Sequence, residues 1–170
     1  MNDLLPPHDP IDALGEAYEL LLEKALQNAH KSGALVHQMI EECRGDLVAL
    51  NKFSDDEIVM LQAYLKRDLL DAALYLKKTG KDLKFWLDFD VDLIKRELWG
   101  RFSDAADHTT KELNQLNELA AIGEYHSGEL VGLGTLVCDQ CGEKHHFHKP
   151  SHIPHCIKCH NTHFHRHNFE

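Results

Sequence analysis

The sequence contains no long hydrophobic run and little positive charge. Every apolar run stays well below the ~18 residues that a membrane-spanning helix needs. The first residues, Met-Asn-Asp-Leu-Leu-Pro-Pro, carry acid where a secretory signal would carry base, and they lack its apolar segment. Of 170 residues, 18 are Lys or Arg and 28 are Asp or Glu, which leaves a net charge of −10. We therefore expect a cytoplasmic protein that does not bind membranes, and the charge argues against nucleic-acid binding as its main role.

The acidic charge is concentrated in the first part of the chain. Residues 1–122 hold 14 of the 18 basic and 23 of the 28 acidic residues, a net charge of −9, whereas residues 123–170 carry −1. Hydrophobic residues make up 43% of the chain, which is too many for a disordered protein. After Gly123, glycines become frequent and the helical period is lost. The sequence therefore predicts two domains, an acidic helical region over 1–122 and a small β domain over 123–170.

Apolar residues in the first domain recur at steps of three and four, which predicts helices. Ser54 and Glu57 form a capping box before the clearest of them, and Gly80 follows its end. Residues 81–90 fit either a strand or a helix. The fold class expected is mainly α, with antiparallel helical hairpins or a coiled-coil-like bundle followed by a small β zinc ribbon. The expected helices cover residues 10–32, 36–50, 55–79 and about 90–123.

Four of the five cysteines form two Cys-x-x-Cys pairs, Cys138 with Cys141 and Cys156 with Cys159. Each pair predicts a tight turn, or knuckle, that points both sulfurs at one metal ion. Four thiolates complete a tetrahedral shell with no open position, so we expect one structural zinc ion per chain. Disulfides are disfavoured in the cytoplasm. Iron also fits tetrahedral sulfur, but nothing else in the sequence suggests electron transfer.

The residue after each knuckle indicates the backbone conformation there. Gly142 follows the first knuckle, where a positive φ is often needed. His160 occupies the same place in the second knuckle. We expect the neighbouring Asn161 to make the left-handed turn, because asparagine tolerates that conformation better.

Three stretches closely resemble an uncharacterised bacterial family of zinc-ribbon-containing proteins. They are Ile94–Trp99, Gly123–Cys138, and the run from Cys159 through Phe164 and Arg166 to Phe169. The resemblance is specific over residues 93–170 and is limited to helical pattern and acidity before them. It implies an N-terminal helical region, a ribbon with four cysteine ligands, and a cytoplasmic protein without an assigned reaction. This chain differs in its many histidines and in having His160 where the family usually has glycine.

Ten of the 14 histidines lie at or after His126. His163, His165 and His167 alternate, so on a strand they would share one face, with Phe164 and Arg166 on the other. One interpretation is a weak second metal site for zinc, nickel or copper, or a pH-sensitive surface. The interpretation that we favour is a solvated strand face.

No polar constellation points to catalysis, so the leading hypothesis is a non-enzymatic protein-interaction scaffold. Its partners are expected to be proteins that bind the acidic helical region, and a homodimer formed through the helical stripes is the structural alternative. A second hypothesis is a nucleic-acid-associated ribbon, although the ribbon has only Lys144, Lys149, Lys158 and Arg166 as bases. A third is metal handling by the histidines. The acids expected to be exposed include Glu41, Glu42, Asp55, Asp56, Asp68 and Asp71.

Overall fold

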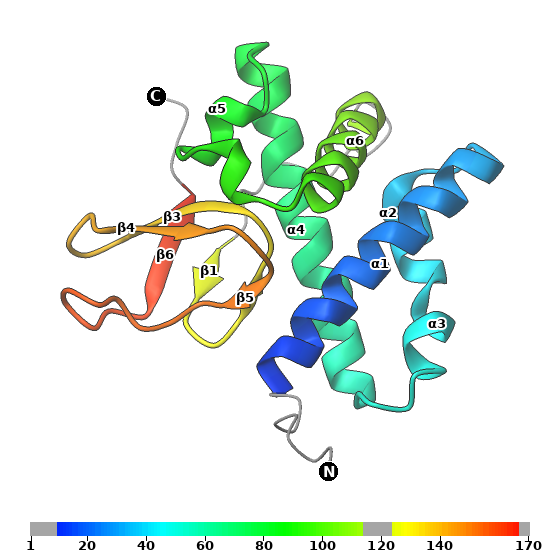
Figure 1. Cartoon of the computed structure of the whole chain (residues 1–170), viewed down its shortest axis with the longest axis horizontal. Coiled ribbons are helices and arrows are strands. Elements are labelled where there is room, and N and C mark those ends of the chain that lie inside the picture. The colour runs from blue at the N-terminus through cyan, green and yellow to red at the C-terminus, as the bar shows by residue number, and fades with distance from the viewer. Residues whose placement is uncertain (1–9, 114–123, 167–170) are drawn as a thin grey trace.

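The computed structural model describes residues 10–113 and 124–166. Figure 1 shows α1, α2, α3 and α6 on one side, the strands on the other with α5 above them, and α4 running between the two sides. The helices are α1 (Pro10–Ser32), α2 (Val36–Glu42), α3 (Arg44–Val48), α4 (Asp55–Thr79), α5 (Lys84–Leu87), the 3₁₀ turn η2 (Val91–Leu93) and α6 (Arg96–Glu112). The strands are β1 (Tyr125–His126), β2 (Leu130–Val131), β3 (Gly134–Cys138), β4 (Lys144–Phe147), β5 (Ser151–His152) and β6 (His163–Arg166).

This order of elements confirms the expected fold class of helices followed by a small β domain. The start of α4 also agrees with the prediction. The Ser54 hydroxyl accepts a hydrogen bond from the backbone N–H of Glu57, and the Glu57 carboxylate accepts one from that of Ser54. At the other end, Gly80 adopts a left-handed φ of 66°. None of the helices in the described residues is both long and apolar enough to cross a membrane.

Two helix predictions were wrong in their bounds. The helix expected over 36–50 is broken at Cys43, where ψ is 6° and the N–H of Asp46 bonds back to the Cys43 carbonyl. This turn leaves both Cys43 and Leu47 buried. The last helix starts at Arg96 instead of Asp90, because the Asp90 carboxylate caps the short η2 turn.

Residues 81–90 contain a single short helix, α5, which ends where Asp88 takes a left-handed φ of 63°. The predicted continuation of the last helix to residue 123 and the predicted domain boundary at 122/123 both lie outside the described residues.

The ribbon consists of two antiparallel sheets. One has the strand order β1-β6-β3-β4, and the other pairs β2 with β5. Its small core contains Tyr125, Leu136, Phe147 and Phe164 together with the buried cysteines. Leu130 and Leu133 instead join the large hydrophobic cluster of the helices. The ribbon and the helical region therefore share apolar contacts.

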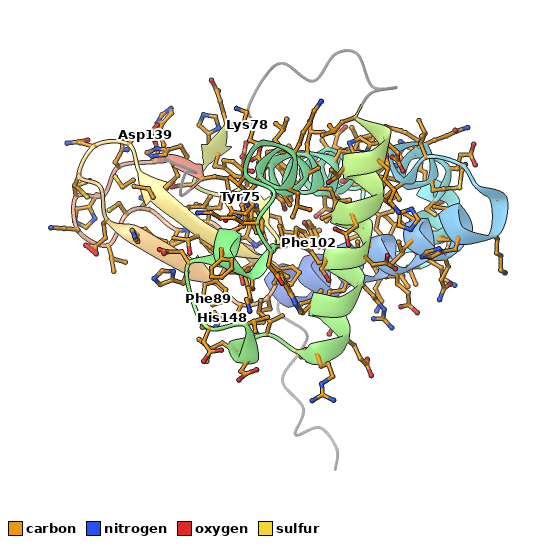
Figure 2. The ribbon with its side chains drawn as sticks, turned by 90° about the horizontal axis from the view of Figure 1, so that it is seen from above. Tyr75, Lys78, Phe89, Phe102, Asp139 and His148 are labelled. Atoms are coloured by element: carbon orange, nitrogen blue, oxygen red, sulfur yellow. The ribbon has the colours of Figure 1, made fainter. Side chains whose placement is uncertain are left out.

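The segment before α6 covers one edge of the ribbon. Figure 2 shows Phe89 beside His148, and their ring centroids lie 4.9 Å apart. Trp86 stacks on Phe102 of α6 at 5.7 Å. Lys144 of β4 forms an ion pair with Asp88 at 2.9 Å. The contacts of Phe89 and Asp88 join this segment to β4 and to the loop that follows it, and the Trp86 stack joins α5 to α6.

Asp68, on α4, was expected to be exposed but is completely buried. One carboxylate oxygen accepts hydrogen bonds from the Tyr18 hydroxyl at 2.6 Å and the Gly132 N–H at 2.8 Å. The other accepts from Arg166 at 3.0 Å and from Arg67 at 3.4 Å. Asp68 therefore connects α1, α4 and the ribbon. Its four donors compensate for the loss of hydration that burial imposes.

Asp71, one turn further along α4, was also expected to be exposed and is 4% exposed. It accepts a hydrogen bond from the Tyr125 hydroxyl and lies 3.8 Å from the Arg166 guanidinium. Arg166 also donates to the Tyr125 oxygen at 3.0 Å and lies over the Trp86 ring at 4.5 Å. Burial lowers the pKa of Arg166, but the oxygen of Tyr125 and the carboxylates outweigh it and raise the pKa above its ordinary value. Arg166 therefore stays charged.

Removing the Asp68 charge should destabilise the protein strongly. We expect Asp68→Asn to lower the free energy of unfolding by about 3 kcal/mol, because the buried guanidinium of Arg166 would lose one of the two carboxylates that balance its charge. Asp107→Asn is the matched control, since Asp107 is an exposed aspartate on α6, and it should change stability by less than about 0.5 kcal/mol. Urea denaturation of both variants measures the difference. Equal effects would contradict a special role for the buried pair.

Candidate metal centre

The structure brings the four predicted cysteines together. Cys138 ends β3 and Cys141 lies in the turn before β4, while Cys156 and Cys159 lie in the turn between β5 and β6. All four sulfurs lie within 4.8 Å of one another. The Cys138–Cys159 and Cys141–Cys156 sulfurs are 3.5 Å apart. Zinc–sulfur bonds of ~2.3 Å in a tetrahedron place the sulfurs about 3.8 Å apart. The cluster therefore fits a four-thiolate metal centre.

Backbone hydrogen bonds shape both knuckles in the same way. The N–H of Gly142 donates to the Cys138 carbonyl at 3.0 Å, and the N–H of His160 donates to the Cys156 carbonyl at 2.8 Å. These equivalent bonds hold each Cys-x-x-Cys turn closed, with its two sulfurs on the same side.

Nearby N–H groups also favour the thiolate form of Cys138. Its sulfur accepts hydrogen bonds from the Gln140 N–H at 3.4 Å and the Asn161 amide at 3.5 Å. Burial raises the pKa of Cys138, but hydrogen bonds from the N–H groups of Cys141 and Gln140 and from Asn161 outweigh it and lower the pKa to about 6. The pKa of Cys156 is lowered as well, whereas at Cys141 and Cys159 the backbone hydrogen bonds are outweighed by burial and the neighbouring sulfurs, which raise the pKa of each. Binding of a metal ion would displace the protons that those thiols retain.

The left-handed turns are not both where we expected them. Gly142 has a φ of 78°, as predicted. In the second knuckle, His160 itself has a φ of 65°, so the assignment of that turn to Asn161 was wrong. The Asn161 side chain has another role, because its amide donates to the Cys138 sulfur and to the His163 carbonyl. His160 therefore holds the strained position that glycine occupies in the first knuckle.

His163 and His165 of β6 are exposed, and Phe164 and Arg166, which alternate with them, are buried, as the alternation predicted. His163 contacts the ring of His126 with centroids 4.7 Å apart. His165 lies 2.5 Å from the carboxylate of Asp139, which Figure 2 marks in the ribbon. His167 lies outside the described residues. A second metal site formed by His163, His165 and His167 stays a prediction.

The residues that join the ribbon to α4 were not identified from the sequence. Two signals were present. Asp68 lies on the apolar stripe of α4, directly before Leu69, and Arg166 alternates with exposed histidines on β6 in the same phase as Phe164. A charged residue at a buried position of each element indicates a buried ion pair.

Comparisons with known proteins agree with this architecture. Residues 23–168 match the family model described as a zinc-ribbon containing domain. The chain is 31% identical over 154 residues to the uncharacterized protein YbeL of Escherichia coli strain K12, covering 88% of this chain and 91% of that protein. YbeL from strain O6:H1 and from O157:H7 gives the same values. No solved structure matches. These matches confirm the family resemblance.

Replacing His160 by glycine should stabilise the ribbon. A left-handed backbone costs an L-residue about 1–2 kcal/mol, and the extra freedom of glycine in the unfolded chain cancels part of the gain. We expect His160→Gly to raise the free energy of unfolding by about 0.5–1 kcal/mol. Gly142→Ala provides the opposite control, because a Cβ there meets nothing within 4 Å and adds only backbone strain. Denaturant unfolding at a fixed zinc concentration checks both signs.

Proposed function

Because the chain belongs to the family of proteins with a zinc-ribbon containing domain, we propose that it is a non-enzymatic scaffold whose ribbon is held by one structural zinc ion. In this proposal Cys138, Cys141, Cys156 and Cys159 are the ligands. The helical region binds other proteins through an acidic surface. Thiolate ligands need a reducing environment, so we expect the protein to act in the cytoplasm.

The proposed role of the metal follows from its ligand set. Four thiolates leave no coordination position for water or substrate, so the ion would stabilise the fold without taking part in chemistry. Zinc is preferred over iron because nothing else in the sequence suggests electron transfer. The buried polar groups beside the ribbon also support a structural role. Arg166 pairs with Asp68 and lies 3.8 Å from Asp71, and two tyrosines form hydrogen bonds with these groups.

The observation that carries the proposal is an exposed corner of the helical region, residues 41–60, that combines acids with apolar side chains. Arg44 lies 3.3 Å from Asp55 and Lys66 pairs with Glu41, so part of the negative charge is balanced. The exposed acids are Glu41, Glu42, Asp46, Asp55 and Asp56. The exposed apolar residues are Val48, Leu50, Val59 and Met60, which are 39–52% exposed.

Such a corner suits a protein partner. Exposed apolar side chains supply the burial that drives association, and the acids around them attract a basic surface and repel phosphates. In a homodimer the acids of two copies would face each other unless they were offset. We therefore favour a basic protein as the partner over a second copy of the chain.

The nucleic-acid alternative is weakened by the positions of the ribbon cations. Arg166 is buried and pairs with Asp68, and Lys144 pairs with Asp88. Lys149 and Lys158 are left as the exposed bases of the described ribbon. Two lysines supply little of the phosphate neutralisation on which nucleic-acid affinity depends.

Metal content tests the first half of the proposal. We expect one tightly bound zinc ion per chain by atomic emission, and Cys138→Ser or Cys156→Ser should abolish tight binding because the shell loses a thiolate. Cys43→Ala is the matched control, since this fifth cysteine is buried between α2 and α3, away from the cluster. Iron in the purified protein, or zinc retained by both serine variants, would contradict the assignment.

Charge reversal of the corner tests the second half. The triple variant Glu42→Lys, Asp46→Lys and Asp56→Lys should lose most protein partners captured by the full chain, and capture by the wild type should weaken as salt rises. Lys149→Glu combined with Lys158→Glu is the control in the ribbon and should retain the partners. Nuclease-sensitive capture of RNA, lost in the lysine variant, would favour the nucleic-acid alternative instead.

A further inference from the structure

Two histidines and an aspartate converge on the surface where α1 meets α6. His30 lies in the last turn of α1, and Asp104 and His108 lie one turn apart on α6. The Nε2 of His30 is 3.1 Å from one oxygen of Asp104, and the Nε2 of His108 is 3.7 Å from the other. The two imidazole rings are nearly perpendicular, with centroids 4.7 Å apart. Three side chains from two helices therefore point at one place.

These distances suit a shared metal ion. The candidate ligand atoms of the three residues lie within 4.8 Å of one another. Metal–ligand bonds of ~2.0–2.2 Å in a tetrahedron place neighbouring ligand atoms about 3.4 Å apart. The observed separations of 3.1 and 3.7 Å lie on either side of that value. Small rotations of the side chains would bring all three atoms onto one ion.

The chemistry of the three groups selects a class of ion. Imidazole nitrogen suits zinc, nickel, copper and iron, whereas calcium and magnesium prefer oxygen ligands alone. Two histidines and one carboxylate leave at least one position for water. The side chains of His30 and Asp104 are 49% and 46% exposed, so an ion can enter directly from solvent.

The surroundings add negative charge and rigidity. Glu112 follows His108 by one turn on the same face of α6, and its buried Oε1 has no hydrogen-bond partner within the described residues. Its other oxygen accepts a hydrogen bond from the N–H of Val36 at 2.9 Å, which fixes the start of α2 against α6. Two carboxylates, from Asp104 and Glu112, therefore lie near His108 in a part of the molecule where three helices meet.

We propose that His30, Asp104 and His108 form a second metal site, separate from the ribbon, for a divalent transition ion such as zinc or nickel. The ion would connect the end of α1 to the middle of α6. The site uses neither the ribbon cysteines nor the histidines of β6, and it does not depend on the proposed scaffold function.

The test is a titration of the full chain that already carries its ribbon zinc. Nickel, added during isothermal titration calorimetry, should bind with one further equivalent per chain. His30→Gln combined with His108→Gln should weaken that binding by about 100-fold or more, since each lost ligand removes at least a factor of about ten. Asp104→Asn should weaken it by about tenfold. Paramagnetic broadening of the ring-proton signals of His30 and His108 identifies the ligands independently of affinity.

His163→Gln combined with His165→Gln is the control, because it removes the exposed histidines of β6 and should leave the extra equivalent intact. Far-ultraviolet circular dichroism of each variant establishes that the helices are retained. Absence of a further equivalent in the wild type, or its retention in the His30 and His108 variant, would overturn the proposal. Loss of the equivalent in the β6 control would place the ion on the ribbon instead. In each case the zinc of the ribbon is measured separately.

Discussion

The buried ion pair between Arg166 and Asp68 is the interaction on which the arrangement of the two parts depends. Arg166 ends β6, and the same strand begins shortly after Cys159, so a metal at the cysteines and the ion pair hold opposite ends of one short segment. A buried charge is stable only when its partners are complete. If the cysteines lost their metal and β6 detached, Asp71 would lose Arg166, Asp68 would keep only Arg67 as its cation, and Leu130 and Leu133 would leave the helical core. The stability of α4 and the integrity of the metal centre are therefore linked.

Local features of the fold could be predicted because they depend on neighbouring residues. The capping box at Ser54 and the left-handed Gly80 set the ends of α4, and both follow from backbone hydrogen bonding within one turn. The start of α6 was misplaced because the carboxylates from Asp88 to Asp92 also suit a helix N-terminus. In the structure they cap a 3₁₀ turn and pair with Lys144. The break at Cys43 depends on the packing of α3 against its neighbours. The apolar periodicity of a single helix gives no information about that packing.

The cysteine cluster and the other polar clusters also differ in whether they depend on neighbouring or on distant residues. The cysteine cluster was found from the sequence because two short motifs contain all four residues, and a knuckle has one common geometry. The ion pair joins residues separated by 98 positions, and the His30–Asp104 contact joins residues separated by 74. In the cluster of His30, Asp104 and His108, the sequence shows only one pair. Asp104 and His108 are four residues apart on a predicted helix. An α-helical spacing of one acid and one histidine is too common to indicate a metal site without the third residue.

The division of charge between surface and interior bears directly on the proposed function. The formal charge of −9 over residues 1–122 overstates the acidity of the surface, because Asp68 and Asp71 are buried against Arg166. The same pairing removes the only arginine of the ribbon from its surface. Both effects bear on the choice between a protein partner and nucleic acid. The buried acids lie outside the exposed corner, so the corner keeps all of its exposed acids, whereas the ribbon surface loses one of its few cations. The ribbon would then contribute by holding β6 and Arg166 in place beneath α4, and the exposed helical surface would be the part that contacts other molecules.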